Sequence, residues 1–131
     1  MARFRLPAED LEYAVLAQLW ALGLASVREL HEQVGVPQGL VYTTTAKVVD
    51  RLREKGLIER QRTRGVFLYR PRIARDEVER ARARNAVGRL LGSTPRAAVA
   101  ALVEAVDAVD PTLLDELERA VLARRRSRNG A

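Results

Sequence analysis

The hydrophobic pattern changes its period between residues 57 and 71, and this change restricts the fold more than any other feature of the chain. Residues 57–62 and 66–70 are two strand-like runs, joined by Thr63-Arg64-Gly65 and followed by Pro71. Two such runs around a short glycine-containing connection predict a β-hairpin, and the proline ends it because proline cannot continue a strand ladder. The other apolar patterns are helical, so we expect a mainly α-helical chain with one small β-hairpin.

Three helical segments precede the hairpin. The first spans residues 7–22 and should stop at Gly23, the second should open at Ser26 with a capping box and run to about residue 33, and the third spans residues 38–55. Residues 24–25 are too few for more than a fragment of strand. The third helix should bury one side and expose the other. Its expected inward stripe is Val41, Thr45, Val48 and Leu52, and its expected exposed residues are Thr43, Ala46, Lys47 and Asp50.

Three further helices follow the hairpin. A long arginine-rich helix is expected over residues 74–91, and Thr94-Pro95 and Asp110-Pro111 each begin another. The basic end of the chain lacks these signals and is expected to be disordered. The sequence therefore predicts a first domain over residues 1–73, a three-helix region over 74–126 and a disordered tail over 127–131.

Positive charge is concentrated in the third helix and the hairpin. The 131-residue chain has a formal net charge of +6, and residues 40–72 carry nine Lys or Arg against three Asp or Glu. Such a concentration is typical of surfaces that bind polyanions. Three helices closed by a two-stranded hairpin form a winged helix-turn-helix, in which the third helix enters the DNA major groove and the hairpin follows the backbone. Topology and charge thus both predict DNA binding by the first domain.

The candidate DNA-binding residues carry hydroxyl or cationic groups on the third helix and the hairpin. They are Tyr42, Thr43, Thr44, Lys47, Arg51, Lys55, Arg62 and Arg64. Threonine and lysine side chains near the helix start can reach base edges, whereas a tyrosine hydroxyl and the arginines suit phosphates. Thr44 lies close to the inward stripe and is expected to be partly structural. Asp50 would repel phosphate, so we expect it to pair with a neighbour such as Arg53.

The apolar stripes of the last two helices exceed what three short helices can hide among themselves. They consist of Val99, Leu102, Val103, Val106, Leu113, Leu117 and Val121. We expect these residues to bury against a second copy of the chain in a two-fold homodimer.

Other classes of function find no support in the sequence. The chain has no cysteine, which excludes disulfides, thiol nucleophiles and thiolate metal sites. Its single histidine, His31, is expected to be packed or at the surface, and no nucleophile–base pair, phosphate-binding glycine loop or carboxylate cage occurs. We therefore expect no enzyme activity, no catalytic residue, no cofactor and no metal. No apolar run is long enough to span a membrane and the N-terminus is unlike a signal peptide, which predicts a cytoplasmic protein.

Several motifs resemble the penicillinase-repressor family, of the BlaI and MecI type. They are Leu11-Glu12 and Leu19-Trp20, then Val41-Tyr42-Thr43-Thr44-Thr45, the run from Arg51 to Leu57, and Tyr69-Arg70-Pro71. The resemblance covers residues 6–73 and implies a dimeric repressor that binds a palindromic operator in double-stranded DNA, with the C-terminal helices making the dimer.

Three departures from the family pattern limit what can be carried over. Lys47 stands where relatives often have threonine, so the operator sequence can differ. A regulatory protease cuts the resistance repressors at an Asn-Phe bond, where this chain has Ala101-Leu102, which argues against that route of control. The cysteines of the copper-responsive branch are absent.

Two alternatives remain open at this stage. One is a ligand-sensing winged-helix regulator. The small number of aromatic residues, two Phe, three Tyr and one Trp, argues against it because they cannot line an aromatic-rich cavity. The other is a protein-interaction module whose basic face is incidental.

Overall fold

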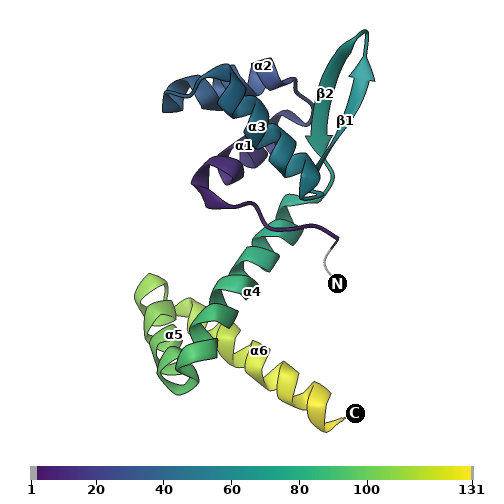
Figure 1. Cartoon of the computed structure of the whole chain (residues 1–131). Helices are drawn as coiled ribbons and strands as arrows, with labels where there is room; N and C mark the ends of the chain where they lie inside the picture. Colours follow the sequence, from purple (N-terminus) through teal and green to yellow (C-terminus); the bar gives the residue numbers. More distant parts are fainter. Residues whose placement is uncertain (1–2, 131) are drawn as a thin grey trace. The chain divides into compact units, whose positions relative to one another are not determined.

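The computed structural model describes residues 3–130, which divide into two units, one ending at Ala83 and the other beginning at Arg84. The first unit contains α1 (Glu9–Leu22), α2 (Val27–Leu30), α3 (Tyr42–Glu54), β1 (Ile58–Thr63) and β2 (Val66–Pro71), as Figure 1 shows. The helix α4 (Arg75–Ser93) begins in this unit and ends in the other, which also holds α5 (Pro95–Val109) and α6 (Thr112–Asn129). The predicted fold class, mainly helical with one small hairpin, is confirmed.

Local signals set the start and end of the first helices. Gly23 ends α1 with φ 79°, and its N–H donates to the carbonyl of Leu19. Ser26 and Glu29 form both halves of the predicted capping box, because each side chain accepts a hydrogen bond from the other residue's backbone N–H. The chain continues past the predicted end at residue 33, through a π-helical turn at His31–Gly35 and a 3₁₀ turn at Val36–Gln38.

The third helix is shorter at its start than predicted. Gly39 adopts a left-handed conformation (φ 72°) and Val41 is extended, so α3 begins only at Tyr42. The expectation that Val41 faces inward is therefore wrong, since its side chain is 65% exposed. Val49 is fully buried instead, together with the predicted Thr45, Val48 and Leu52.

The hairpin is a regular antiparallel pair with a two-residue turn. Thr63 lies opposite Val66, and the turn residues Arg64 and Gly65 both have positive φ, 52° and 80°. Positive φ at both central positions is the requirement of a type I′ turn, whose twist matches that of the strands. The predicted strand fragment at Ala25 pairs with Tyr69 through two backbone hydrogen bonds of 2.7 and 2.9 Å, which ties the hairpin to the helices.

One hydrophobic core holds the first unit together. It includes Leu16 and Leu19 of α1, Leu52 of α3 and Ile58 of β1, all almost completely buried. The core also takes in the first turns of α4, because Val78 is fully buried. Around it, Trp20 Nε1 donates to the carbonyl of Ile73 at 3.0 Å. This packing explains why the first unit extends to Ala83, beyond the boundary predicted after residue 73.

The second unit lacks a core of this kind. Between residues 84 and 130 no side chain reaches the burial of the first unit's interior, although α5 and α6 contact each other. Both helices begin where the proline signals place them. The disordered tail predicted over 127–131 is wrong for residues 127–129, which complete α6, while residue 131 lies outside the described residues.

Candidate nucleic-acid interface

The exposed side of α3 presents polar groups at a spacing of four residues. Thr43, Lys47 and Arg51 follow one another along the helix, and all three are exposed. This exposure was predicted for Thr43 and Lys47, whereas Ala46, also predicted to be exposed, is half-buried. Opposite them, Val48 and Leu52 are buried in the core. The helix is therefore fixed by its apolar side while one continuous polar side remains open to a ligand.

The first turn of α3 is held by the only histidine of the chain. His31 Nδ1 lies 2.8 Å from Oγ1 of the buried Thr45, and its ring packs edge-on against Tyr42, with 5.5 Å between ring centroids. Tyr42 keeps about half of its surface exposed, and Thr44 is half-buried as expected. The contact with His31 orients Tyr42 at the start of the exposed side of α3.

Lys55 does not belong to this exposed surface. Its ammonium Nζ is 2.6 Å from Glu12 Oε1, and the two side chains are only 16% and 7% exposed. The same Glu12 oxygen accepts the backbone N–H of Ala8 at 3.0 Å. Lys55 thus joins the end of α3 to the start of α1, and we leave it out of the proposed phosphate contacts.

The hairpin carries three arginines on its outer part. Arg62 lies directly opposite Phe67 in the strand register, and Arg60 extends over the same ring, with its guanidinium carbon 4.2 Å from the ring centroid. Sequence reasoning missed Arg60, although the pairing of residues two apart on one face of a hairpin could have indicated it. Arg64 occupies the turn itself, in a left-handed conformation that non-glycine residues rarely adopt.

Neighbouring acids neutralise only part of the positive charge of residues 40–72. Arg53 pairs with Asp50 as expected, and Arg70 pairs with Glu59. Among the ion pairs of the described residues, none involves the exposed cations Lys47, Arg51, Arg60, Arg62 and Arg64. The available cations therefore lie on the outer side of α3 and on the hairpin, apart from Arg72 directly after the hairpin.

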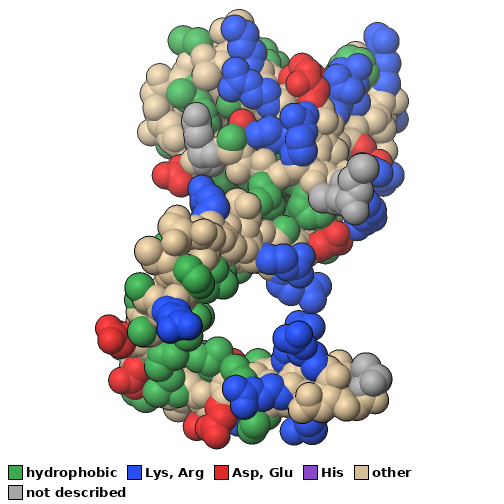
Figure 2. All heavy atoms as spheres, turned by 60° about the horizontal axis from the view of Figure 1, so that its bottom comes forward, with side chains coloured by type: hydrophobic (Ala, Val, Ile, Leu, Met, Phe, Trp, Pro, Cys, Tyr) green, Lys and Arg blue, Asp and Glu red, His purple; other side chains and the backbone are tan. Residues whose placement is uncertain are grey.

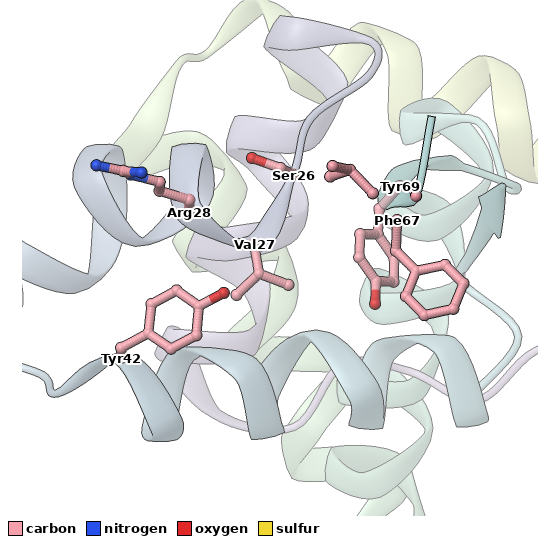
Figure 3. Close-up of a pocket in the computed structure, with 8 residues that line it drawn as sticks. Ser26, Val27, Arg28, Tyr42, Phe67 and Tyr69 are labelled. Carbon is pink, nitrogen blue, oxygen red and sulfur yellow. The ribbon is translucent and has the colours of Figure 1, made fainter. Parts of the chain in front are cut away.

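A hollow separates the hairpin from the first turn of α3. It has a volume of about 390 Å³ and is lined by Ser26, Val27, Arg28, Tyr42, Gly65, Val66, Phe67 and Tyr69. Figure 3 shows the rings of Phe67 and Tyr69 on the hairpin side and that of Tyr42 on the helix side, with Val27 between them. Three of the six aromatic residues of the chain thus gather between the two candidate binding elements.

The predicted apolar stripes of the second unit are only partly covered within the chain. Val99, Leu102, Val103 and Val121 are exposed, whereas Val106, Leu113 and Leu117 are half-buried. Leu90, Val109 and Leu122 are further exposed apolar residues of the same unit. Figure 2 shows hydrophobic side chains, in green, over the surface of these helices.

Across residues 3–130, no helix combines the length and the apolar character needed to cross a membrane. Within the same residues, no three histidine or carboxylate side chains come together as metal ligands.

Comparison with known proteins places the chain among transcriptional regulators. The model of the penicillinase repressor family matches residues 9–123. A transcriptional regulator BlaI of Mycobacterium tuberculosis is 34% identical over 113 residues, which are 86% of this chain and 80% of the relative. The solution structure of the DNA-binding domain of the repressor BlaI covers 56% of this chain and 92% of its own, at 21% identity and a TM-score of 0.50, and so supports the winged-helix fold. The chain belongs to the penicillinase repressor family.

Proposed function

We propose that the protein is a homodimeric transcriptional repressor that binds a palindromic operator in double-stranded DNA. In this proposal α3 lies in the major groove and the β1–β2 hairpin follows the flanking backbone. The five exposed cations of α3 and the hairpin that no carboxylate neutralises carry the proposal most directly. Family membership and the winged-helix fold support the same conclusion.

The roles of individual residues follow from their positions. Lys47 is proposed to contact base edges together with Thr43, since both lie on the exposed side in the first two turns of α3. Tyr42 and Arg51 are proposed to hold phosphates. Arg62, Arg64 and Arg60 would reach phosphates from the hairpin, where Phe67 keeps Arg60 and Arg62 extended.

The dimer is proposed to form through the second unit. Most of the stability of a protein helix comes from packing of its apolar face, and α5 and α6 have no buried residue. A second copy would cover the exposed stripes and complete the unit. Each copy would then offer one α3 to one half of a palindrome.

The central test compares Lys47→Ala with Arg51→Ala on two DNA duplexes, the promoter of the protein's own gene and a random sequence. Lys47→Ala should weaken promoter binding by about 1–3 kcal/mol and random binding much less, because base contacts exist only on the cognate sequence. Arg51→Ala, the matched control from the same helix side, should weaken both about equally. Titrations at one salt concentration provide the comparison. An equal loss on both duplexes for Lys47→Ala would show that this residue holds phosphate and that α3 is oriented differently.

A second test concerns the hairpin. Arg64→Asn removes the charge while retaining a residue that tolerates positive φ, so the turn should stay intact. Binding to every duplex should weaken, and the slope of log affinity against log salt should fall by about one. An unchanged slope would show that Arg64 at the hairpin tip does not contact the DNA backbone. Absence of any salt-dependent binding by the parent protein would contradict the proposed function itself and favour a protein-interaction module.

A further inference from the structure

The start of α4 is attached to α1 by long side chains. Tyr13 and Trp20 are two helical turns apart and share one side of α1, where their rings meet edge to face with 6.0 Å between centroids. On α4, the spacing of Arg75, Glu79 and Arg82 likewise places these residues on one side of the helix. A row of aromatic rings on α1 is thus available to a row of charged side chains on α4.

Three contacts join the two rows. The Tyr13 hydroxyl donates to the Glu79 carboxylate, and a charged acceptor makes such a bond strong. The guanidinium carbon of Arg82 lies 3.8 Å from the centroid of the Tyr13 ring. At the other end of the row, the guanidinium carbon of Arg75 lies 5.7 Å from the centroid of the Trp20 ring. We call Tyr13, Glu79 and Arg82 the α1–α4 clasp.

The clasp extends beyond the part of α4 that the core holds. Val78 is fully buried in the core, which fixes the first turn of the helix. Arg82 is half-buried, lies one turn further along and directly precedes the end of the first unit at Ala83. In the described part of the chain no ion pair involves Arg82, so the ring of Tyr13 is the partner that the structure shows for its charge. The clasp therefore holds α4 where the helix leaves the first unit.

The direction of α4 matters because the helix is long and unbroken. It runs from Arg75 to Ser93 (Figure 1) and extends about 22 Å beyond Val78, at about 1.5 Å per residue. A tilt of about 10° would move its far end by about 4 Å, which exceeds the roughly 3.4 Å between successive base pairs. In a homodimer bound to a palindrome, the direction of each α4 thus affects the distance between the two α3 helices.

We infer that Tyr13, Glu79 and Arg82 are positioning residues, which fix the direction of α4 and thereby set the half-site spacing that the protein accepts. The inference rests on the proposed homodimeric repressor and adds which residues make it selective for spacing. A link that matches the span between two sites raises the effective concentration for the second binding event, whereas a looser link lowers that concentration and tolerates other spans. Breaking the clasp should therefore reduce selectivity for spacing without changing how one α3 contacts one half-site.

Duplexes of different spacing test the clasp in the full-length protein. Footprinting on the promoter of the protein's own gene identifies the palindrome, and further duplexes carry a base pair added or removed at its centre, or a single half-site. The parent protein should bind the altered palindromes about tenfold more weakly than the native one. Tyr13→Leu removes both the hydroxyl and the ring, so its loss on the altered palindromes should be about threefold or less. The same variant should bind the single half-site as the parent protein does.

Matched variants on α4 separate the clasp from a loss of charge. Arg82→Gln breaks the clasp from the α4 side and should also weaken the preference for the native spacing. Arg80→Gln removes the same charge from the opposite side of α4, where Arg80 pairs with the exposed Asp76 at 2.9 Å, and should keep the parental preference. Tyr13→Phe keeps the ring and loses only the hydroxyl, so its preference should be intermediate. If Tyr13→Leu does not fold, Arg82→Gln and Tyr13→Phe decide the result.

The outcomes separate this inference from the proposed function. A parental preference for spacing in both Tyr13→Leu and Arg82→Gln would overturn the role of the clasp and leave the proposed repressor intact. Equal weakening on the single half-site and on every palindrome would also overturn it, because the clasp would then only stabilise the first unit. A parent protein that binds no palindrome would instead contradict the proposed function on which the inference rests.

Discussion

The two units of the molecule use similar amounts of helix in opposite ways. Residues up to Ala83 enclose a core in which Leu16, Leu19 and Leu52 are fully buried. Residues 84–130 form long helices with no buried side chain and with exposed Val99, Val103 and Val121. Since burial of apolar surface is the main force that stabilises a fold, we expect the first unit to be stable by itself and the second to depend on a further covering surface. This difference fits the proposal that the first unit contacts DNA and that the second unit binds a second copy of the chain.

The largest expected effect tests the self-sufficiency of the first unit. Glu12→Gln removes the negative charge that neutralises the buried ammonium of Lys55. Removing one partner of a buried ion pair leaves the other charge without a counter-charge. The substitution should therefore lower the free energy of unfolding by about 3 kcal/mol or more, independently of protein concentration. Denaturant unfolding followed by fluorescence of Trp20, the single tryptophan, measures it.

The control for this substitution is Glu59→Gln, which breaks the exposed pair with Arg70. It should cost less than about 1 kcal/mol. Equal losses in the two variants would show that the Glu12–Lys55 pair is solvated and that the first unit is more open than described.

Replacing glycine by alanine should change the free energy of unfolding in opposite directions in the two units. A Cβ on Gly35 would lie 2.3 Å from both His31 Nδ1 and Thr45 Oγ1, so Gly35→Ala should destabilise the first unit by about 1–3 kcal/mol. A Cβ on Gly88, in α4 within the second unit, meets nothing within 4 Å. Gly88→Ala should therefore stabilise that helix by about 0.5–1 kcal/mol. Thermal unfolding of both variants tests the contrast, and a stabilising Gly35→Ala would refute the close packing of His31 on α3.

Local sequence signals were sufficient to predict most helix ends and the hairpin of the first unit. The capping box of Ser26, the stop at Gly23 and the hairpin around Arg64 depend on neighbouring residues, and the sequence alone located them. Segment-level charge also pointed to α3 and the hairpin as the basic region. Signals of this kind succeed because capping, turns and periodicity are determined within a few residues.

The errors arise where distant residues decide the outcome. The local sequence predicts that Lys55 contacts phosphate, since its partner Glu12 is 43 positions away and helical spacing does not reveal the pair. Helical spacing predicts that Val41 faces inward, because the spacing does not reveal the left-handed conformation of Gly39 before it. Arg60 was missed because its stacking on Phe67 requires the register of the hairpin.

The smallest expected effect concerns the start of α6. The backbone N–H and the hydroxyl of Thr112 donate to Asp110, and these bonds hold the pKa of that carboxyl below its ordinary value. A lowered pKa in the folded state means that the stabilisation is present at neutral pH and is lost as pH falls through the lowered value. The stability advantage of the parent protein over Asp110→Ala should therefore shrink in acid. Helicity measured against pH in both proteins tests this, and an advantage that grows in acid would contradict stabilisation by the Thr112–Asp110 hydrogen bonds.

The most direct test of the contrast between the units is a dilution series of the full-length protein, followed by circular dichroism and by Trp20 emission. Trp20 lies in the first unit, so its emission should stay native at all concentrations. The helical signal should fall as the dimer dissociates, because α5 and α6 lose the surface that covers them. Sedimentation in the same range identifies the dissociation. A monomer that keeps its full helical signal would contradict the proposal that residues 84–130 need a second copy to stay folded.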